Sequence, residues 1–256
     1  LEAYYAISGM GAVLHTLNIR LFPDQLSYVV THAEDKVIIL NDTLVPLLAK
    51  VVHELETVRH IVVVGKGDWS PLSAAPNAQL HRYDDLIDAS LADGDYPWPE
   101  LDERAPAAMA YTSGTTGNPK GVLYSHRSTL LHTFAIALPD SLSVSATDCI
   151  LPVVPMFHVN AWGLPYVACM VGVKLVFPGP ALDGKSLYEL FENEGVTMSA
   201  GVPTVWQGLL AYTDANNLKF STMNRTVIGG SACPPAMISS FKDEHGVAVL
   251  HAWGMT

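Results

Sequence analysis

A run of hydroxyl, glycine and lysine residues near the middle of the chain has the composition of a phosphate-binding loop. Residues 108–122 read AMAYTSGTTGNPKGV, and an apolar, strand-like stretch leads into the loop. Glycines let the backbone turn tightly and bring N–H groups close to an anion, while hydroxyls and a lysine add donors and positive charge. The pattern predicts a polyphosphate-binding loop made by Thr112, Ser113, Gly114, Thr115, Thr116, Gly117 and Lys120.

The order of residues around the lysine separates this loop from the P-loop of nucleotide hydrolases. A P-loop places glycine directly before its lysine and serine or threonine directly after it. Here Lys120 follows Pro119 and precedes Gly121, so a P-loop kinase or ATPase is disfavoured. An ordinary Ser/Thr/Gly surface loop is the simpler alternative. It is also disfavoured, because such a loop would seldom follow a buried strand and end in Pro-Lys-Gly.

The segment YTSGTTGNPKG resembles the signature loop of the adenylate-forming superfamily, which includes acyl-CoA synthetases, luciferases and peptide-synthetase adenylation domains. The resemblance extends from EAYYAISGMGAVLHTLNIRL to the end of the chain. In that superfamily the loop holds the β- and γ-phosphates of ATP, and the residues given above inherit this role by match. The resemblance also implies ATP, Mg²⁺ and coenzyme A as cofactors or cosubstrates.

The segment PMFHVNAWG, residues 155–163, resembles the superfamily's aromatic motif beside the carboxylate substrate. Amino-acid-activating members carry an aspartate where this chain has His158. A neutral histidine would leave a buried ammonium group unpaired, which is costly, so the expected substrate is a carboxylic acid without an α-amino group. The alternative is that His158 is a structural histidine.

The same segment, read as FHVNAWG, resembles the fatty-acyl-CoA synthetase branch, in which Trp162 would wall off or gate an apolar acyl tunnel. Simple core packing of Trp162 is the alternative. A helix starting near Asn160 would turn His158 and Trp162 toward one cleft. We expect this helix to cover residues 160–171.

Two further segments resemble superfamily elements that line the acyl and adenine pockets. VIGGSACPP, residues 227–235, reads as a strand ending in a glycine turn, and ligands of parallel α/β sheets bind at such carboxyl ends. By match, Gly229 faces the acyl group, and GVPTVWQGLL, residues 201–210, lies near the acyl tunnel. The implied adenine-side residues are Gly230, Ser231 and Ala232, and the implied acyl-side residues are Val202 and Thr204.

The last six residues, HAWGMT, match the superfamily motif aromatic-Gly-x-Thr-Glu. The match implies that Trp253 stacks on adenine and that Thr256 contacts the α-phosphate. The nucleotide-binding residues implied here are His251, Ala252, Trp253, Gly254, Met255 and Thr256. The family glutamate that ligates Mg²⁺ would follow Thr256, so no metal ligand is expected within the chain. We expect an incomplete large domain without the C-terminal lid domain, and inactive alone.

The elements that must position these residues alternate between apolar strand-like runs and helical patterns. This βαβ rhythm predicts an α/β fold with parallel-rich sheets covered by helices and two neighbouring subdomains. The subdomain boundary is expected in the Pro- and Asp-rich stretch 92–106. Strands are predicted at 37–40, 60–65, 107–112, 149–154, 173–177, 196–200, 225–229 and 247–251. Helices are predicted at 3–17, after Pro23 with Asp24 as cap, and at 42–55, 126–138, 160–171, 184–194, 203–213 and 235–244.

Composition narrows the class of protein further. The net charge of −11 and the lack of a basic stripe disfavour nucleic-acid binding. No apolar run reaches the roughly 18 residues of a transmembrane helix, and an acidic surface favours a cytoplasmic location. Three widely spaced cysteines, Cys149, Cys169 and Cys233, are expected to be buried free thiols. Synthetases of this kind are often dimeric, so a homodimer is an expectation.

The resemblance therefore implies ATP-dependent activation of a medium- or long-chain fatty acid to acyl-AMP and then acyl-CoA. Lys120, Thr256 and His158 are the residues expected to take part in the chemistry. The alternatives are an aryl- or methylthioalkanoate-CoA ligase with the same chemistry, and a non-catalytic module that binds a nucleotide or an acyl group.

Overall fold

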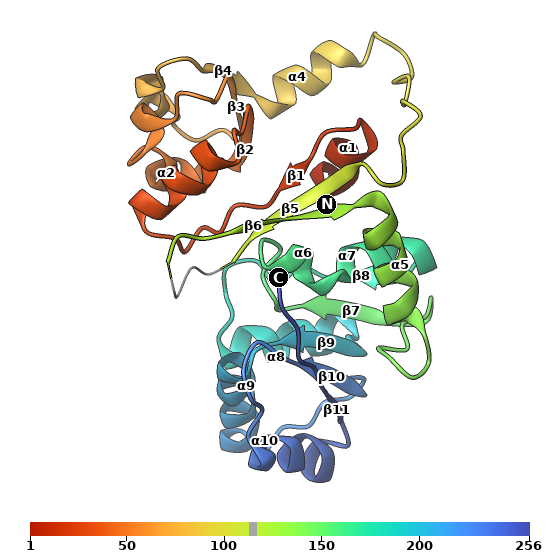
Figure 1. Cartoon of the computed structure of the whole chain (residues 1–256). Coiled ribbons are helices and arrows are strands. Elements are labelled where there is room, and N and C mark those ends of the chain that lie inside the picture. Colours follow the sequence, from red (N-terminus) through yellow and green to blue (C-terminus); the bar gives the residue numbers. More distant parts are fainter. Residues whose placement is uncertain (113–116) are drawn as a thin grey trace. The chain divides into compact units, whose positions relative to one another are not determined.

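The computed structural model describes residues 1–112 and 117–256, which form two compact units (Figure 1). One unit comprises Glu2–Tyr124, and the other comprises Ser125–Thr256 together with Leu1. The predictions for Ser113, Gly114, Thr115 and Thr116 concern residues outside the described part.

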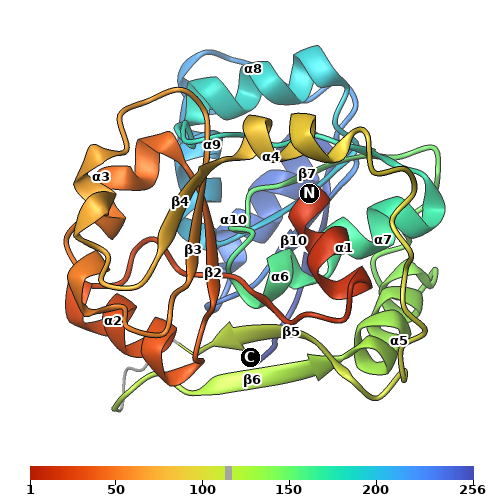
Figure 2. The same cartoon turned by 90° about the horizontal axis from the view of Figure 1, so that it is seen from above.

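The first unit contains a three-stranded parallel sheet in the order β2-β3-β4 (Figure 2). Residues of β2 alternate between exposed and buried, because helices and short turns cover one face and leave the other open. The buried residues form one core, centred on Val30, Ile38, Ile61, Val63 and Leu72. The elements are α2 (Pro23–His32), β2 (Val37–Asn41), η1 (Asp42–Leu44), α3 (Val45–Leu48), η2 (Val52–Glu54), β3 (His60–Val64), η3 (Ser70–Ala74), β4 (Gln79–Arg82) and α4 (Tyr83–Ser90).

A second three-stranded sheet of this unit carries the predicted phosphate loop between two of its strands. Its order is β1 (Leu14–His15), β5 (Pro106–Tyr111), β6 (Gly121–Ser125), and β1 is parallel to β5. The helix predicted over 3–17 was wrong in its second half, since α1 covers only Glu2–Gly9. Gly11 has φ +86°, and Leu14–His15 pairs with β5 instead, so a long-range pairing overrides the local helical spacing.

Two other local predictions in this unit need correction. The helix predicted over 42–55 is divided into η1, α3 and η2. Asp24 is not the cap of α2, because the capping position is Phe22 and Asp24 lies in the first turn.

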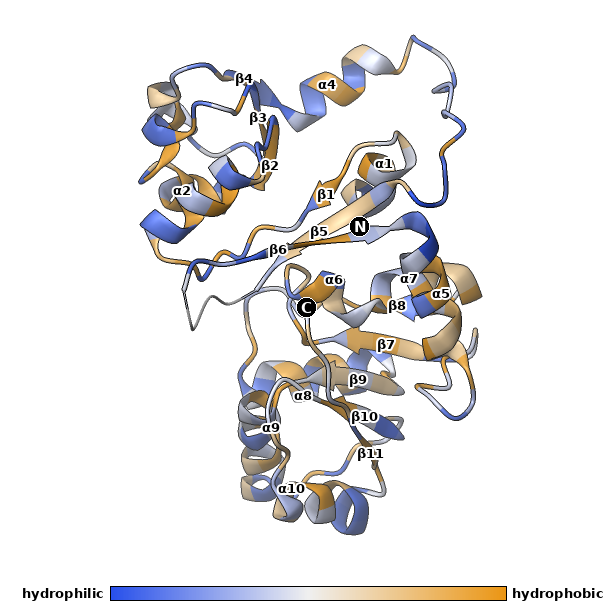
Figure 3. Ribbon diagram, viewed as in Figure 1, coloured by the Kyte–Doolittle hydropathy of each residue, from blue (hydrophilic) through white to orange (hydrophobic). Residues whose placement is uncertain are grey.

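The stretch 92–106 connects α4 to β5 within the first unit and is coloured mainly as hydrophilic in Figure 3, whereas the units divide at Ser125.

The second unit is built on a five-stranded sheet in the order β11-β10-β9-β7-β8, in which every neighbouring pair is parallel. This confirms the α/β class and the predicted strands. The strands are β7 (Cys149–Pro152), β8 (Lys174–Leu175), β9 (Met198–Gly201), β10 (Arg225–Ile228) and β11 (Ala248–His251). The helices are α5 (His126–Ala137), α6 (Val159–Trp162), α7 (Leu164–Val171), α8 (Gly184–Glu194), α9 (Pro203–Ala215) and α10 (Pro235–Ser239), which continues into a π-helical turn, η4 (Ser240–Glu244).

Helices cover both faces of this sheet, so its strands read as continuous apolar runs. Successive residues of a strand point to opposite faces, so Leu151 and Ile228 pack against α8, α9 and η4. Their neighbours Ile150 and Val227 pack against α5 and α7 on the other face. The double coverage leaves the ends of the strands as the places where loop residues gather.

Two remaining observations bear on composition. In the described part of the chain no helix is both long and apolar enough to cross a membrane. All three cysteines are free, and Cys149 and Cys233 are buried, but Cys169 is exposed. The prediction of three buried thiols was therefore wrong for Cys169, which lies on the outer face of α7.

Candidate functional site

The carboxyl ends of β9, β10 and β11 form one edge, at which three chain segments leave the sheet side by side. Gly229 donates its N–H to the carbonyl oxygen of Gly201 at 3.2 Å, and Ala252 donates to Ile228 at 2.8 Å. These bonds extend the ladder by one residue beyond each strand. The predicted acyl-side and adenine-side segments thus begin at the same edge, where ligands of parallel α/β sheets bind.

Gly229 lies against the ring of Trp162. A Cβ at residue 229 would lie 3.1 Å from the ring atom Cη2 of Trp162 and 3.1 Å from the carbonyl oxygen of Ala252. The absence of a side chain is thus what admits the indole at this point. The structure therefore brings together two residues that the sequence analysis placed on the acyl side.

Trp162 reaches this position through an unusual backbone turn. Val159, Asn160, Ala161 and Trp162 all have φ between 45° and 55°, which is the left-handed helical region. The continuous helix predicted over 160–171 was wrong here, because α6 is this left-handed turn and α7 starts after Gly163. Left-handed conformation costs about 1–2 kcal/mol per residue for side chains larger than glycine. Burial of Asn160 and Ala161 at 5% and 0% exposure supplies the packing that offsets the cost.

The turn after β10 continues the same edge. Gly230 has φ +81°, and a Cβ there would lie 3.1 Å from Cγ1 of Val202, the residue that precedes α9. Val202 therefore joins Gly229, Gly230 and Trp162 at the edge. Thr204, Ser231 and Ala232 are exposed, and Thr204 lies in the first turn of α9.

The last residues of the chain leave the sheet after His251. The Nε2 atom of His251 accepts a hydrogen bond from the backbone N–H of Cys233 at 3.3 Å, so this side chain ties the turn after β10 to β11. Trp253 is 86% exposed, Met255 is 76% exposed, and Gly254 is also exposed. The Trp253 ring is therefore open to a flat partner, and Thr256 is half-buried.

His158 precedes the left-handed turn, and its side chain is exposed. The surrounding protein still desolvates the imidazole enough to lower the pKa of His158 below its ordinary value of 6.5. The side chain is therefore neutral at pH 7.

The predicted phosphate loop belongs to the first unit and is closed at its base. Thr112 donates its N–H to the carbonyl oxygen of Lys120, and Lys120 donates its N–H to Oγ1 of Thr112, both at 3.0 Å. In the second of these bonds Oγ1 of Thr112 is the acceptor. Lys120 and Gly117 are exposed, and no described atom lies within 4 Å of a Cβ built at Gly117.

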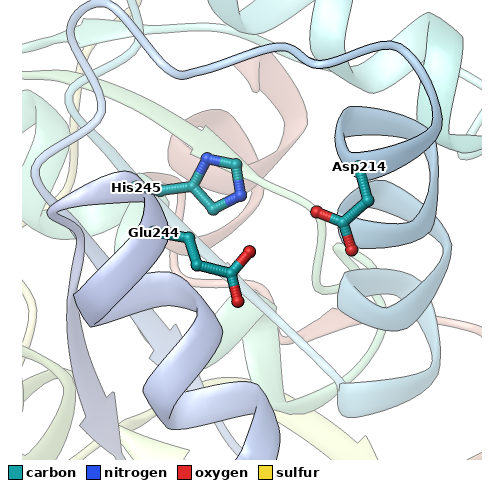
Figure 4. A group of neighbouring side chains, drawn as sticks. All are labelled: Asp214, Glu244 and His245. Carbon is teal, nitrogen blue, oxygen red and sulfur yellow. The ribbon is translucent and has the colours of Figure 1, made fainter.

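One group of three metal-type ligands occurs among the residues that the structure describes (Figure 4). Asp214 lies near the end of α9, Glu244 ends η4, and His245 follows it. Both elements lead into the starts of strands, so the group lies at the amino end of the sheet, away from the edge described above. Burial and the nearby Lys219 charge lower the pKa of His245, and the Lys219 ammonium donates to the Glu244 carbonyl at 2.6 Å.

The sequence analysis missed two features around these sites. It did not anticipate that Gly163, with φ +79°, is required by the close approach of His132, whose ring lies 2.7 Å from a Cβ built there. It also missed the partners of Tyr111 at the base of the phosphate loop. A glycine directly after a tryptophan was the available signal for the first feature, and the second left no signal in the local sequence.

The parallel sheets and the helices that cover them define an α/β protein, and its sequence carries a hydroxyl-rich loop that ends in a lysine. The chain belongs to the family of AMP-binding enzymes, whose family model matches residues 1–256. This membership confirms the resemblance to the adenylate-forming superfamily.

The chain is similar to two curated acyl-CoA ligases over its whole length. It is 55% identical to a medium-chain-fatty-acid–CoA ligase of Ectopseudomonas oleovorans, covering 46% of that protein. It is 50% identical to a 3-methylmercaptopropionyl-CoA ligase of Ruegeria lacuscaerulensis, covering 47% of it. The chain thus spans about half the length of the curated relatives it matches.

The fold is also similar to a solved structure, a long-chain-fatty-acid-CoA ligase from Archaeoglobus fulgidus. The TM-score is 0.81 at 21% identity, and the match covers 99% of this chain and 49% of that one.

Proposed function

We propose that the protein containing this chain activates a medium- or long-chain fatty acid with ATP and transfers the acyl group to coenzyme A. The observation that carries the proposal is the contact between Trp162 and Gly229 at the carboxyl edge of the sheet. An acyl chain requires an apolar surface close to the proposed nucleotide site. The Trp162 ring supplies such a surface beside the glycine turn. Family membership and the names of the relatives support the same reaction.

The reaction needs two displacements and no side-chain nucleophile. The carboxylate oxygen attacks the α-phosphorus of ATP, and the bond to the β-phosphate bridging oxygen breaks, giving acyl-AMP and pyrophosphate. The coenzyme A thiolate then attacks the acyl carbon, and AMP leaves. Positioning and charge neutralisation provide most of the acceleration in such phosphoryl chemistry.

Each proposed role follows from what the side chain can do. Lys120 stabilises the negative charge that develops on the departing pyrophosphate, and Thr112 donates its hydroxyl proton to a phosphate oxygen. Trp253 offers a face to adenine, and the Thr256 hydroxyl donates to the α-phosphate. His158, being neutral, lies beside the substrate carboxylate without competing for it as a cation.

Magnesium belongs to the proposed reaction, but the segments at the carboxyl edge lack the carboxylates that it prefers. The segments 227–235 and 251–256 contain no aspartate or glutamate, whereas Mg²⁺ is bound in proteins mainly through carboxylates and phosphate oxygens. The Asp214 group lies at the other end of the sheet. No step is therefore assigned to a metal held by this chain's residues.

A panel of acids tests the proposed function on the full-length protein. Pyrophosphate release should be fastest with one or more acids between C6 and C18, and slower with acetate, cinnamate and 3-methylthiopropionate. The 256-residue chain alone should bind ATP or AMP in calorimetry and form little or no thioester. Absence of nucleotide binding by the folded chain would contradict the proposal, whereas efficient thioester synthesis by it would contradict only the expectation that this chain is inactive alone.

A methylthioalkanoate-CoA ligase is the second candidate function, favoured by the similarity to the 3-methylmercaptopropionyl-CoA ligase. In the same panel it requires 3-methylthiopropionate to be the best substrate. An aryl-CoA ligase requires cinnamate to be preferred, and a non-catalytic module releases no pyrophosphate with any acid.

Trp162 and Gly229 should control which acyl chains are accepted. We expect Trp162→Ala to shift the preferred acid by about two to four carbons or to raise ATP turnover without acid, because the ring no longer fills the space beside Gly229. Gly229→Ala should displace the ring and reduce turnover of the longest acids. Trp98→Ala, at an exposed tryptophan in the first unit, is the matched control. An unchanged preference and unchanged basal turnover in both site variants would refute this role.

A cytoplasmic location is also proposed, from the acidic composition. A homodimer is proposed because synthetases of this kind are often dimeric. Cell fractionation and sedimentation of the full-length protein test them, and a membrane-bound or strictly monomeric protein would contradict them.

A further inference from the structure

Both ends of the phosphate loop converge on Tyr111. This residue ends β5 and is followed directly by Thr112, which carries the two hydrogen bonds to Lys120. A Cβ at Gly121, the first residue of β6, would lie 3.0 Å from Cζ of Tyr111 and 3.2 Å from its Oη. The tyrosine ring therefore lies directly on the backbone where the loop returns to the sheet, and only glycine leaves room for it.

Tyr111 is itself held by two other elements of the first unit. Its Oη lies 2.7 Å from Nδ1 of His32 on α2, and its ring lies 5.0 Å, centroid to centroid, from that of His15 on β1. The Nδ1 atom of His15 in turn pairs with both carboxylate oxygens of Asp35, at 2.8 and 3.0 Å. Tyr28 stacks on His32 at 5.2 Å.

The proton of the Tyr111 phenol supplies a donor for the hydrogen bond to His32. Burial, the Asp35 charge and Tyr28 raise the pKa of Tyr111 above its ordinary value of 10, so the phenol keeps its proton. In the tautomer that leaves Nδ1 of His32 without a proton, the phenol donates and Nδ1 accepts. The His15–Asp35 pair is well shielded, with side chains 7% and 13% exposed, so the ring contact to Tyr111 has a firm support.

We propose that Tyr111, held by His32 and by the His15–Asp35 pair, is a positioning residue that sets the placement of Thr112 and Lys120 on the phosphates of ATP. The proposal rests on the proposed function of this loop. Displacing a positioned group by about 1 Å can reduce an enzymatic rate about 100-fold. Loss of the single hydrogen bond between Tyr111 and His32 should have a smaller effect, seen in the rate of adenylate formation rather than in affinity for the acid.

The test uses ATP–pyrophosphate exchange by the full-length protein with its best acid. Tyr111→Phe keeps the ring on Gly121 and removes only Oη, and His32→Leu removes the acceptor. Each should lower kcat for exchange about 10-fold, consistent with one lost, partly shielded hydrogen bond, and leave KM for the acid within about twofold. The double variant should be no worse than either single variant, because both remove the same bond.

A conservative variant separates positioning from folding. His32→Asn restores an acceptor near the position of Nδ1 and should recover most of the lost exchange rate. If the role of His32 were purely structural, His32→Asn and His32→Leu proteins of equal thermal stability would have equal exchange rates. His53→Leu, at an exposed histidine that pairs with Glu54, should leave exchange unchanged. A Tyr111→Phe protein with the wild-type kcat for exchange would overturn the proposal. Additive losses of kcat in the double variant would overturn it as well. If none of the acids supports pyrophosphate exchange by the wild-type protein, the proposed function itself fails, and this is a different result.

Discussion

Replacing Arg225 with alanine is expected to lower the free energy of unfolding of the second unit by about 3–5 kcal/mol, the usual effect of breaking a buried ion pair from one side. Arg225 begins β10, and its guanidinium donates to both carboxylate oxygens of Asp148 at 2.8 and 2.9 Å. The two side chains are only 15% and 8% exposed. The arginine also donates to the carbonyl oxygens of Leu142 and Ser143.

The cost is large because Asp148 organises the amino end of the sheet. It accepts from the hydroxyl of Thr197 at 2.7 Å and from the backbone N–H of Ser145 at 2.9 Å. Without Arg225 a nearly buried carboxylate would remain with no opposite charge. The starts of β7, β9 and β10 would lose their common anchor.

The same pair predicts a pH dependence with a defined sign. Burial alone would raise the pKa of Asp148, but hydrogen bonds from Arg225, Thr197 and Ser145 outweigh it and lower the pKa from 3.8 to about 2. A lowered carboxyl pKa stabilises the folded state above the unfolded pKa, here above about pH 4, and the stabilisation disappears as the pH falls toward 2. The shift corresponds to about 2 kcal/mol.

Denaturant titration of this chain measures both effects, and hydrogen exchange of β9 and β10 amides assigns them to the second unit. The matched control is Lys185→Ala, which breaks an exposed pair with Glu189 and should cost less than about 1 kcal/mol. The stability difference between wild type and Asp148→Asn should narrow from pH 4 to pH 2. Equal costs for Arg225→Ala and Lys185→Ala, or a difference that does not depend on pH, would show that the pair contributes little.

Gly184→Ala should be the second strongly destabilising change, lowering the free energy of unfolding by about 2–3 kcal/mol through overpacking. Gly184 is the first residue of α8, and a Cβ there would lie 2.4 Å from the carbonyl oxygen of Gly208 and 2.6 Å from Cβ of Tyr212, both on α9. These are backbone and near-backbone atoms, so a rotamer change cannot relieve the clash. The two helices would have to separate along the core that contains Phe191 and Trp206.

Gly208→Ala provides the matched control on the other helix. Outside the backbone of its own helix, no described atom lies within 4 Å of a Cβ built at Gly208, and alanine inside a helix is more favourable than glycine by about 1 kcal/mol. We expect this variant to be as stable as the wild type or slightly more stable in the same titration. A Gly184→Ala protein with wild-type stability would mean that α8 and α9 approach less closely than the structure shows.

The fold of the second unit was predictable because its signals are local and repeated. Each strand from β7 to β11 is a short apolar run that leads to a polar or glycine turn, and the helices between them carry clear periodicity and capping residues such as Asp183. The predictions failed where a local pattern competed with a distant partner. The helical spacing of residues 3–17 gave way to pairing of Leu14 and His15 with β5, and the helix expected from Asn160 gave way to a left-handed turn.

The candidate site divides in the same way. Local sequence supplied the residue types of the phosphate loop, the glycine turn and the final aromatic segment. Ser113, Gly114, Thr115 and Thr116 lie outside the described residues, so their proposed role continues to rest on the resemblance. The hydrogen bonds between Thr112 and Lys120, and the contact of Trp162 with Gly229, could be found only from the tertiary structure.

The sequence by itself determined the class of chemistry, because hydroxyl groups, glycines and a lysine at close spacing suit a polyphosphate wherever the loop lies. It also determined the parallel sheet, since strand and helix periodicities are properties of short segments. Tertiary structure alone decided that Tyr111 meets His32, 79 residues away, and that Arg225 meets Asp148, 77 residues away. Such contacts depend on strand register and packing, and the backbone of Trp162 adopts a left-handed turn only because surrounding burial offsets its local cost.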